Sequence, residues 1–346
     1  MGVTIKDVAK EAGVSIATVS YVINNKGNVT VETKEKVLKA VESLGYQPNL
    51  SARNLVGQKS NLIGVLIPDW GNNDEAVKST KDNFNFDNPF YGNILNSIES
   101  TSTKAGYSIL LIASTITADK IKSIILQRDL DGLIIIGALP KLLNSLAKVK
   151  VPVVLIDSYT DNDNFYKIGI DDEYGGYIAT KHLLDLGHKE IALISGELIE
   201  DGVDMERFKG YQKALFERDI PIKEENICNV GVSMEGGYQG VEELLNQNHD
   251  ITGIFSTADI MSIGIYKKLN ELKLNIPEDI SVVSFDNFPY TEFLHPSLST
   301  ISQPVFLKGR RATELLISLI AGKRTDDHSL TLSIELIERD SVKNLK

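Results

Sequence analysis

A cluster of hydroxyl and amide side chains near the start of the chain could contact a phosphate backbone. The segment GVSIATVSYVINN, residues 13–25, places Ser15, Thr18 and Ser20 among valines and ends in two asparagines. Hydroxyls and amides are good partners for phosphate oxygens and base edges, whereas an ordinary solvated helix face more often carries Lys and Glu. The side chains that would face outward from a helix here are not acidic: Ser15, Ala17, Thr18, Tyr21 and Asn24.

A second set of polar side chains follows apolar runs that are typical of buried strands. Seven such runs occur after residue 60, among them NLIGVLIPD, LDGLIIIGA and DISVVSFD, and helix-length segments separate most of them. This alternation predicts βαβ units with parallel, doubly wound sheets covered on both faces. These runs predict more strands than a single sheet would readily hold, so we expect an α/β body with two lobes.

In doubly wound folds, ligands bind beyond the carboxyl ends of the strands. The residues at those ends are mostly polar: Asp69, Gly137, Asp157, Ser195, Asp259 and Asp286. Carboxylates and amides lining a cleft suit a polyhydroxy ligand such as a sugar. The alternative for each aspartate is that it caps the helix that follows.

Three short helices are expected to position the first set of residues. Thr4 precedes IKDVAKEAG with Asp7 three residues on, which resembles a capping box, and Gly13 ends that helix. Ser15 caps the next helix, IATVSYVIN, and the tight turn at residues 13–14 gives helix-turn-helix spacing, in which the second helix enters a DNA major groove. A small helical bundle without DNA-binding activity has the same pattern and stays the alternative.

The third helix runs through ETKEKVLKAVESLG, buries Val37, Val41 and Leu44, and ends at Gly45. The segment after it contains a helix-forming stretch of about eight residues, which is too short to be stable alone in water. Leu55 in that stretch has no evident core to face. Apolar wedges of this kind can enter a minor-groove base step and kink the duplex.

Composition and charge narrow the classes of protein further. Residues 1–60 have a charge balance of +3, whereas the other residues sum to −14, which suits a head that meets polyanions on a body that does not. The single cysteine offers neither a disulfide framework nor a cysteine-rich metal site, and we expect no metal and no cofactor. No run of about 18 apolar residues is present and the first residues lack an export signal, so we expect a cytoplasmic protein with no membrane partner.

The search for catalytic motifs finds no candidate. G-x-S-x-G, H-E-x-x-H, Walker A and paired CxxC patterns are absent from the sequence, and its five histidines are scattered. We therefore expect a protein that is not an enzyme.

Residues 3–57 resemble the DNA-binding head and hinge of the LacI/GalR family of bacterial transcriptional regulators. The match runs through VTIKDVAKEAGVSIATVSYVIN and on to LGYQPN and the Ala52-Arg53 pair. The resemblance implies that Ile16, Ala17 and Tyr21 read bases. Many members have Arg where this chain has Tyr21, so the operators of Arg-bearing members are not expected here.

The same resemblance implies the remaining DNA contacts. Leu55 would be the minor-groove wedge, with Asn49, Ala52 and Arg53 beside it. Residues expected to contact DNA, most of them through phosphates, are Thr4, Ser15, Thr18, Ser20, Asn24, Asn28, Thr30 and Thr33.

The body resembles the effector-binding core of that family in segments such as NPFYGNIL, RFKGYQKAL and HPSLSTISQP. This implies the fold of periplasmic sugar-binding proteins, with crossovers near Asp171, Ser302 and Ser333. The expected domains are a helix-turn-helix head (1–47), a hinge helix (48–60) and an effector-binding and dimerisation domain (61–346). Within the last, the N-lobe covers about 61–171 and 303–333, and the C-lobe about 172–302 and 334–346.

The resemblance also assigns effector contacts. Phe90 and Tyr91 would flank the ligand, Arg207 would donate a forked pair of hydrogen bonds, and Asp286 would accept from hydroxyls. Asp259 occupies a further effector position. With the strand-end positions above, the predicted set is Asp69, Trp70, Phe90, Tyr91, Asp157, Arg207, Val232, Asp259 and Asp286.

The chain departs from its relatives at three places around this site. Ala258 stands where some members have a sugar-contacting Asn, and Val232 replaces a stacking aromatic. The loop before NPFY is unusually long. Trp70 in that loop could supply the missing stacking surface, or it could merely pack the loop.

Together these features predict a DNA-binding transcriptional regulator. We expect a repressor of carbohydrate-use genes that binds a palindromic operator as a homodimer and responds to a sugar-like effector. A global catabolite regulator that uses a phosphorylated carrier protein is the alternative within the family. A sugar-binding transport protein would share the body but needs an export signal, and a nucleotide-dependent enzyme needs a phosphate loop.

Overall fold

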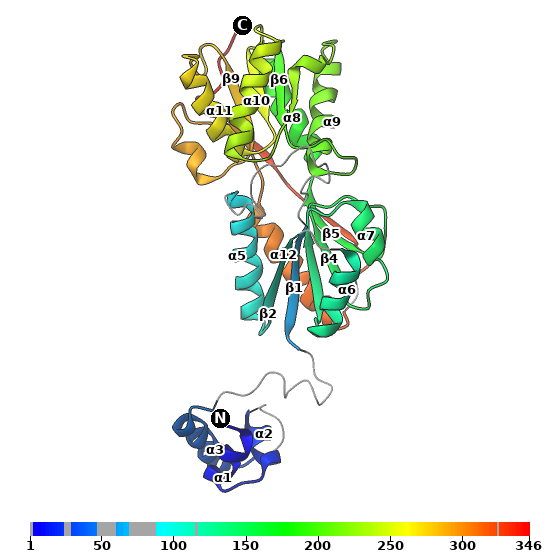
Figure 1. Ribbon diagram of the computed structural model, residues 1–346, viewed down its shortest axis with the longest axis vertical. Helices are drawn as coiled ribbons and strands as arrows, with labels where there is room; N and C mark the ends of the chain where they lie inside the picture. The colour runs from blue at the N-terminus through cyan, green and yellow to red at the C-terminus, as the bar shows by residue number, and fades with distance from the viewer. Residues whose placement is uncertain (1–2, 24–28, 47–59, 69–87, 115–116, 324) are drawn as a thin grey trace. The chain divides into compact units, whose positions relative to one another are not determined.

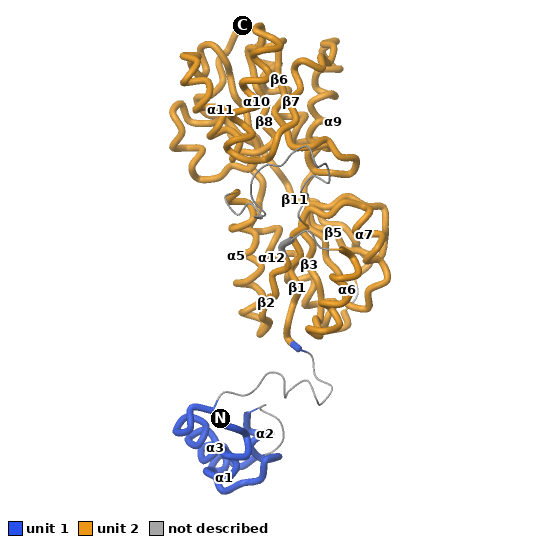
Figure 2. Tube along the Cα trace, in the orientation of Figure 1, with its two compact units in different colours: residues 1–60 blue, residues 61–346 orange. Residues whose placement is uncertain are grey.

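The computed structural model describes residues 3–23, 29–46, 60–68, 88–114, 117–323 and 325–346. The chain divides into two compact units, residues 1–60 and residues 61–346, which are coloured separately in Figure 2. Each unit has its own hydrophobic core. Among the described residues, no helix is long and apolar enough to cross a membrane.

The described residues of the first unit form three helices: α1 (Ile5–Ala12), α2 (Ile16–Ile23) and α3 (Val31–Leu44). The predicted capping box is present, because the backbone N–H of Thr4 donates to Asp7 Oδ2 over 2.8 Å. Gly13 and Gly45 end α1 and α3 in the left-handed conformation, with φ of 65° and 59°, which favours glycine. The start signal of α1 and the end signals of α1 and α3 are therefore confirmed.

A small apolar core holds the three helices together. Its fully buried members are Val8, Ala9, Val19, Val22, Val37 and Ala40. The prediction for α3 was wrong in part: Val37 is buried, but Val41 and Leu44 are only partly buried, and Ala40 takes the central place. Ala40 lies three residues after Val37, and its small side chain lets the helices approach closely.

The second unit is built on two six-stranded sheets, one in each lobe (Figure 1). The strand order is β11-β5-β4-β3-β1-β2 in the N-lobe sheet and β12-β10-β9-β8-β6-β7 in the C-lobe sheet. All pairs are parallel except β10 with β12. Strands β3 and β9 are wholly buried, and for β3 the unbroken apolar sequence GLIII predicts this.

The N-lobe strands are β1 (Leu62–Pro68), β2 (Ser108–Ser114), β3 (Gly132–Ile136), β4 (Val153–Ile156), β5 (Tyr166–Ile170) and β11 (Ser329–Leu332). Helices α5 (Pro89–Lys104) and α12 (Val305–Ile320) share a core with one face of this sheet, and α6 (Ala118–Gln127) and α7 (Pro140–Leu146) with the other. The sheet is therefore doubly wound, as predicted.

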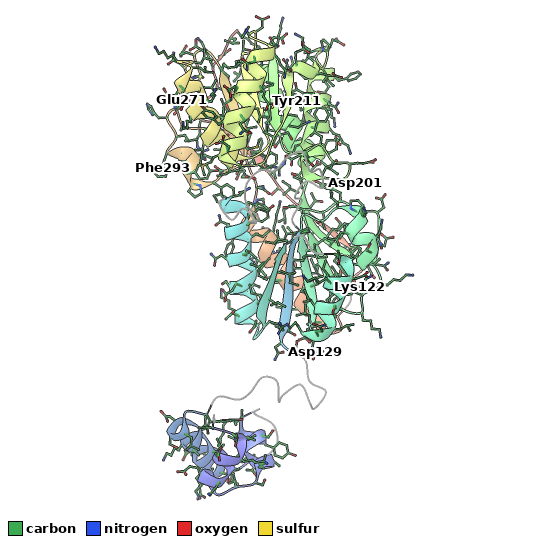
Figure 3. All side chains as sticks on the ribbon, viewed as in Figure 1. Lys122, Asp129, Asp201, Tyr211, Glu271 and Phe293 are labelled. Atoms are coloured by element: carbon green, nitrogen blue, oxygen red, sulfur yellow. The ribbon has the colours of Figure 1, made fainter. Side chains whose placement is uncertain are left out.

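The C-lobe strands are β6 (Ile191–Ser195), β7 (Ile227–Asn229), β8 (Gly253–Ser256), β9 (Ser281–Asp286), β10 (Ser299–Ser302) and β12 (Glu335–Ile337). Its α-helices are α8 (Asp172–Asp185), α9 (Val203–Phe216), α10 (Met234–Gln247) and α11 (Asp259–Glu271). The short 3-10 helix η2 (Glu224–Asn226) precedes β7, and η3 (Pro289–Glu292) lies between β9 and β10. Helices α8 and α9 cover one face of the sheet, where Tyr211 is buried (Figure 3), and α10 and α11 cover the other.

The chain passes between the two sheets three times. It leaves β5 for α8 after residue 170, leaves β10 for α12 after residue 302, and leaves β11 for β12 after residue 332. The carboxyl ends of strands from both sheets and all three crossovers therefore meet in one region, and most of the predicted effector residues lie on its elements.

Candidate DNA-binding and effector sites

Helix α2 presents an uncharged outer surface. Val19 and Val22 face the core, whereas Ile16, Ala17 and Tyr21 are exposed, with Tyr21 52% exposed and Ile16 45%. Two large apolar groups that face solvent on an eight-residue helix are available for contacts with bases and the thymine methyl group. The three predicted base-reading residues thus share the outer face of one helix.

Most of the predicted hydroxyl contacts lie at helix starts, whereas Ser20 lies in the second half of α2. Ser15 Oγ accepts from the backbone N–H of Thr18 over 3.1 Å, and Thr30 Oγ1 accepts from that of Thr33 over 3.4 Å. These hydroxyls cap α2 and α3, so they stabilise the helices whose N–H groups can meet phosphates. Six predicted DNA contacts lie outside the described residues: Asn24, Asn28, Asn49, Ala52, Arg53 and Leu55.

In the body, Arg207 is a buried cation with a buried carboxylate partner. Its Nε and Nη2 each lie 2.8 Å from Asp172 Oδ1, and Nη1 donates to the carbonyl of Thr257 over 2.5 Å. The guanidinium stacks 3.6 Å above the Phe285 ring. Burial is the largest single effect and lowers the pKa of Arg207, but the carboxylates of Asp172, Asp286 and Asp204 together outweigh it, so the pKa is raised.

These contacts occupy three of the five N–H groups that a guanidinium carries. One N–H on Nη1 and one on Nη2 have no partner among the described residues. Two donors on neighbouring nitrogens can form the forked pair that was predicted for Arg207. Tyr159 completes the group by donating to the second oxygen of Asp172 over 2.6 Å.

Asp286 is the last residue of β9 and Asp157 directly follows β4, and both have an unusual backbone conformation. Their φ values of 122° and 47° lie in the region that non-glycine residues rarely adopt, which costs energy and is common at functional sites. Asp286 accepts from the Gln303 side chain, and with Phe306 and Arg310 it lines a hollow of about 490 Å³. Burial raises the pKa of Asp286 to about 6, against the opposing charge of Arg207.

Asp157 pairs with a lysine that the sequence analysis did not single out. Lys308 on α12 is fully buried and donates to Asp157 Oδ1 over 2.6 Å. Burial raises the pKa of Asp157 and Lys308 opposes that rise. Phe90, at the start of α5, lies with its ring centre 5.9 Å from Lys308 Nζ, and Tyr91 packs edge-on to Phe90.

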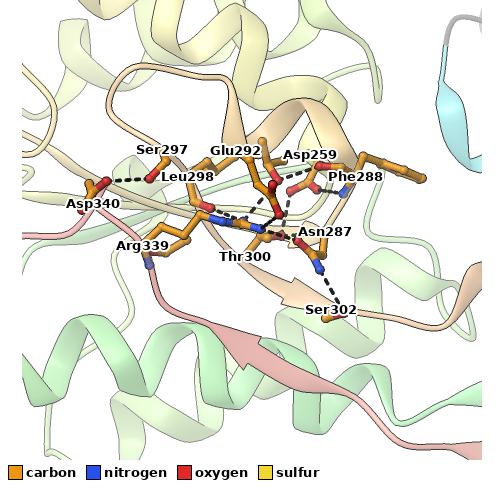
Figure 4. A network of polar contacts seen from close by, with 12 residues as sticks. Asp259, Asn287, Phe288, Glu292, Ser297, Leu298, Thr300, Ser302, Arg339 and Asp340 are labelled. Atoms are coloured by element: carbon orange, nitrogen blue, oxygen red, sulfur yellow. Dashed lines mark hydrogen bonds and ion pairs between the residues drawn. The ribbon is translucent and has the colours of Figure 1, made fainter.

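Asp259 has a structural role in this site. Its side chain is fully buried, Oδ2 accepts from the Phe288 N–H over 2.9 Å, and Oδ1 accepts from the Thr300 hydroxyl over 2.8 Å (Figure 4). Both oxygens therefore already have protein partners. Burial, together with the nearby Asp286 carboxylate, raises the pKa of Asp259 to about 8.

An adjacent group of contacts holds the turn after β9. Arg339 donates to Asn287 Oδ1 over 2.8 Å and to the carbonyl of Leu298 over 2.7 Å, and it pairs with Glu292 (Figure 4). Asn287 has a φ of 62°. This support keeps the Asp286-Asn287 turn in its strained conformation.

Of the remaining predicted effector residues, only Val232 lies within the described part of the chain. Val232 precedes α10 and borders Gly196, where an added methyl group would approach it to 2.8 Å. Asp69 and Trp70 lie outside the described residues, and so does most of the long loop before NPFY.

Four residues of the site were missed: Asp172, Tyr159, Gln303 and Lys308. Lys308 had a signal, because residues 305, 308, 312 and 316 recur at helical spacing and would share one buried face. Asp172 had none, because a carboxylate in the first turn of a helix is ordinary.

Comparisons with known proteins define the class of this protein. Residues 4–49 match the family described as bacterial regulatory proteins, lacI family, and residues 180–342 match the periplasmic binding protein-like domain. The chain belongs to the LacI family of bacterial regulatory proteins. It is a DNA-binding transcriptional regulator with a helix-turn-helix head and a two-lobed ligand-binding body.

Individual relatives match over nearly the whole chain. Catabolite control protein A of Priestia megaterium is 33% identical over 99% of this chain and 100% of its own length. The transcriptional repressor PurR of Histophilus somni (strain 2336) is 35% identical over 99% of each chain.

Solved structures agree. The lac repressor dimer bound to operator and the anti-inducer ONPF is 27% identical, with a TM-score of 0.84 over 99% of this chain and 100% of that one. The complex of the regulator CelR with cellobiose is 26% identical, with a TM-score of 0.71 over 98% and 99%.

Proposed function

We propose that this regulator is a repressor of carbohydrate-use genes that binds a palindromic operator as a homodimer. A small polyhydroxy effector then either weakens or strengthens its binding to that operator. The observation that carries the proposal is the convergence of Arg207, Asp157 and Asp286 near the crossovers between the lobes. Arg207 has two N–H groups without a partner among the described residues, and Asp286 accepts a side-chain hydrogen bond from Gln303. Hydroxyl groups of a sugar can satisfy both kinds of group.

The relatives support a sugar-like effector. CelR was solved with cellobiose, and a LacI-family regulator of Enterococcus faecium with ribose bound is 29% identical with a TM-score of 0.70. In the present chain, the buried cations Arg207 and Lys308 of this site are each paired with a carboxylate. A neutral effector whose hydroxyl groups both accept from Arg207 and donate to Asp286 therefore fits better than an anionic one.

In the proposed mechanism, the two heads of a dimer place their α2 helices in successive major grooves. The segment 48–60 is then a hinge that folds on DNA, with Leu55 as its wedge. Effector binding between the lobes would change their relative angle and the spacing of the hinges. A few kcal/mol of differential binding suffices to switch a marginally stable segment.

A second candidate is a global catabolite regulator with a phosphorylated carrier protein as co-regulator. The support for it is the 33% identity with a protein named catabolite control protein A. The two candidates differ in what must be added to the protein before it recognises its operator.

One experiment tests the proposal. The full chain selects duplexes from a random pool, alone, with a panel of free sugars that includes ribose and cellobiose, and with a phosphorylated carrier protein. We expect a palindromic site whose enrichment changes with one sugar. Enrichment that requires the carrier protein favours the second candidate, and a pool without any preferred site contradicts both.

A further inference from the structure

Lys308 is a charged residue at a position where a helix in a core normally carries an apolar side chain. Its relative exposure is 0%, and it shares the inner face of α12 with Val305, Ala312 and Leu316. A lysine is almost never buried this deeply unless its ammonium group has partners. Nζ donates to Asp157 Oδ1 over 2.6 Å and to Gln303 Oε1 over 2.5 Å.

Gln303 lies on the crossover between β10 of the C-lobe and α12 of the N-lobe. Its side-chain nitrogen donates to Asp286 Oδ1, and its backbone N–H donates to the Asp286 carbonyl over 3.4 Å. The contacts therefore run without a break from Asp157 in the N-lobe, through Lys308 and Gln303, to Asp286 in the C-lobe. We call these four residues the crossover relay.

The chemistry of the relay determines which way the Gln303 amide faces. An ammonium group has donors and no acceptor, so only the amide oxygen can face Lys308. The amide nitrogen must then face away from Lys308, and it meets the Asp286 carboxylate, which can only accept when it is ionised. Lys308 thereby specifies that Gln303 donates to Asp286, although the ammonium group itself donates to Gln303 and Asp157.

We propose that Lys308 is a positioning residue that acts through Gln303: it fixes the carboxylate of Asp286 and ties the two lobes together across the second crossover. The tie consists entirely of contacts between residues of this chain, so it does not depend on the identity of the effector. A ligand that donates to Asp286 competes with Gln303 for the same carboxylate. Ligand binding at the C-lobe is thereby transmitted to α12 of the N-lobe.

A distance measurement between the lobes tests this proposal without any effector. Lys120 on α6 and Asn246 on α10 are exposed, and both become cysteines for spin labels in a Cys228→Ala background. Pulsed electron resonance then gives the distribution of the inter-lobe distance in the full chain. The variants are Gln303→Met, which breaks the relay in the middle, and Lys308→Met with Asp157→Asn, which removes the cation without leaving a buried anion unpaired.

Gln239→Met is the matched control. Gln239 Nε2 donates to Glu235 Oε1 over 3.1 Å on the exposed side of α10, so the same chemical change is made away from the relay. We expect both relay variants to broaden the distribution or to move its mean by roughly 2 Å or more, the scale of domain rearrangements. Because Lys308 acts through Gln303, the variant with all three substitutions should change the mean inter-lobe distance no more than Gln303→Met alone does.

Three results would overturn the proposal. The first is an inter-lobe distance distribution that stays unchanged in either relay variant. The second is a triple variant whose shift equals the sum of the shifts in the two relay variants. The third is a shift in the Gln239→Met control as large as that in the relay variants. If Lys308 only neutralised the Asp157 carboxylate, the variant with Lys308→Met and Asp157→Asn would leave the inter-lobe distance distribution unchanged. Circular dichroism of each variant establishes that it is folded before the distances are compared.

Discussion

Arg207 and Asp172 form a buried pair in which two nitrogens of the guanidinium each lie 2.8 Å from the same carboxylate oxygen. Arg207 is 6% exposed and Asp172 is 1% exposed. The pair joins the start of α8, directly after the first crossover, to α9. Because Tyr159 of the N-lobe donates to the other oxygen of Asp172, the pair also contacts both lobes.

The first prediction concerns this pair. Asp172→Ala leaves the Arg207 charge buried without its carboxylate, so we expect a loss of about 3–5 kcal/mol in the free energy of unfolding. Asp185→Ala is the control, because Asp185 is 41% exposed where it pairs with Lys181 and Arg218 and should contribute less than about 1 kcal/mol. Urea denaturation measures both, and equal losses would contradict the prediction.

The second prediction concerns the close contact of α8 and α9. A methyl group added at Gly176 would lie 2.0 Å from the backbone oxygen of Arg207, so the two helices cannot keep their spacing. We expect Gly176→Ala to destabilise the protein by about 1–3 kcal/mol or more, because overpacking displaces backbone. The displacement carries Arg207 away from Thr257.

Gly92→Ala on α5 is the matched control for this change. Gly92 is exposed and an added methyl group meets nothing within 4 Å. The same substitution should therefore stabilise the protein by about 0.5–1 kcal/mol through helix propensity. Thermal unfolding decides, and a Gly176→Ala variant as stable as the wild type would show that the helices separate at little cost.

The third prediction concerns pH. The pKa of Asp259 is raised to about 8, so between about pH 4 and pH 8 the folded chain holds a proton that the unfolded chain has lost. Stability must then fall as the pH rises through this window. Asp259→Asn removes the titration, while Thr300 can turn its hydroxyl to accept from the new amide. We expect a flatter profile of unfolding free energy against pH.

The comparison uses urea midpoints at pH 5 and pH 8 for the wild type and the variant. Asp161→Asn, at an exposed position of the same body, serves as the control. If the Asp259→Asn profile falls as steeply as that of the wild type, then Asp259 does not titrate in this range.

The fourth prediction concerns operator reading. Tyr21 is exposed and is absent from the head core, so Tyr21→Ala should leave the thermal stability of the head nearly unchanged. We expect it to lower affinity for the selected operator by about 1–3 kcal/mol, as for the loss of a base contact. The dependence of affinity on salt should stay the same, because no phosphate contact is removed.

Fluorescence anisotropy with the selected duplex and with a scrambled duplex distinguishes the loss of a base contact from the loss of a backbone contact. A loss of affinity that is equal for both duplexes would place Tyr21 against the backbone rather than the bases. Thr33→Val is a useful partner variant. If Thr33 contacts a phosphate, this substitution removes the contact and weakens binding to both duplexes alike.

The local signals in the sequence determined the elements themselves. The capping residues Thr4 and Ser15 and the stop glycines Gly13 and Gly45 act on backbone within a few residues, and the structure has helices α1 to α3 where these signals placed them. The apolar runs determined the buried strands in the same way, because a strand covered on both faces needs apolar side chains on both. The two-lobed class followed from the number of runs.

Only the tertiary structure decided what the buried charges do. Asp157 and Lys308 are separated by 151 residues, and Arg207 and Asp172 by 35, so no local pattern reveals that they meet. The post-strand aspartates look alike in sequence, yet Asp259 has both oxygens occupied by protein groups while Asp286 faces Gln303. Spacing along the chain governs hydrogen bonds within an element, whereas the pairing of charges depends on which elements the packed core brings together.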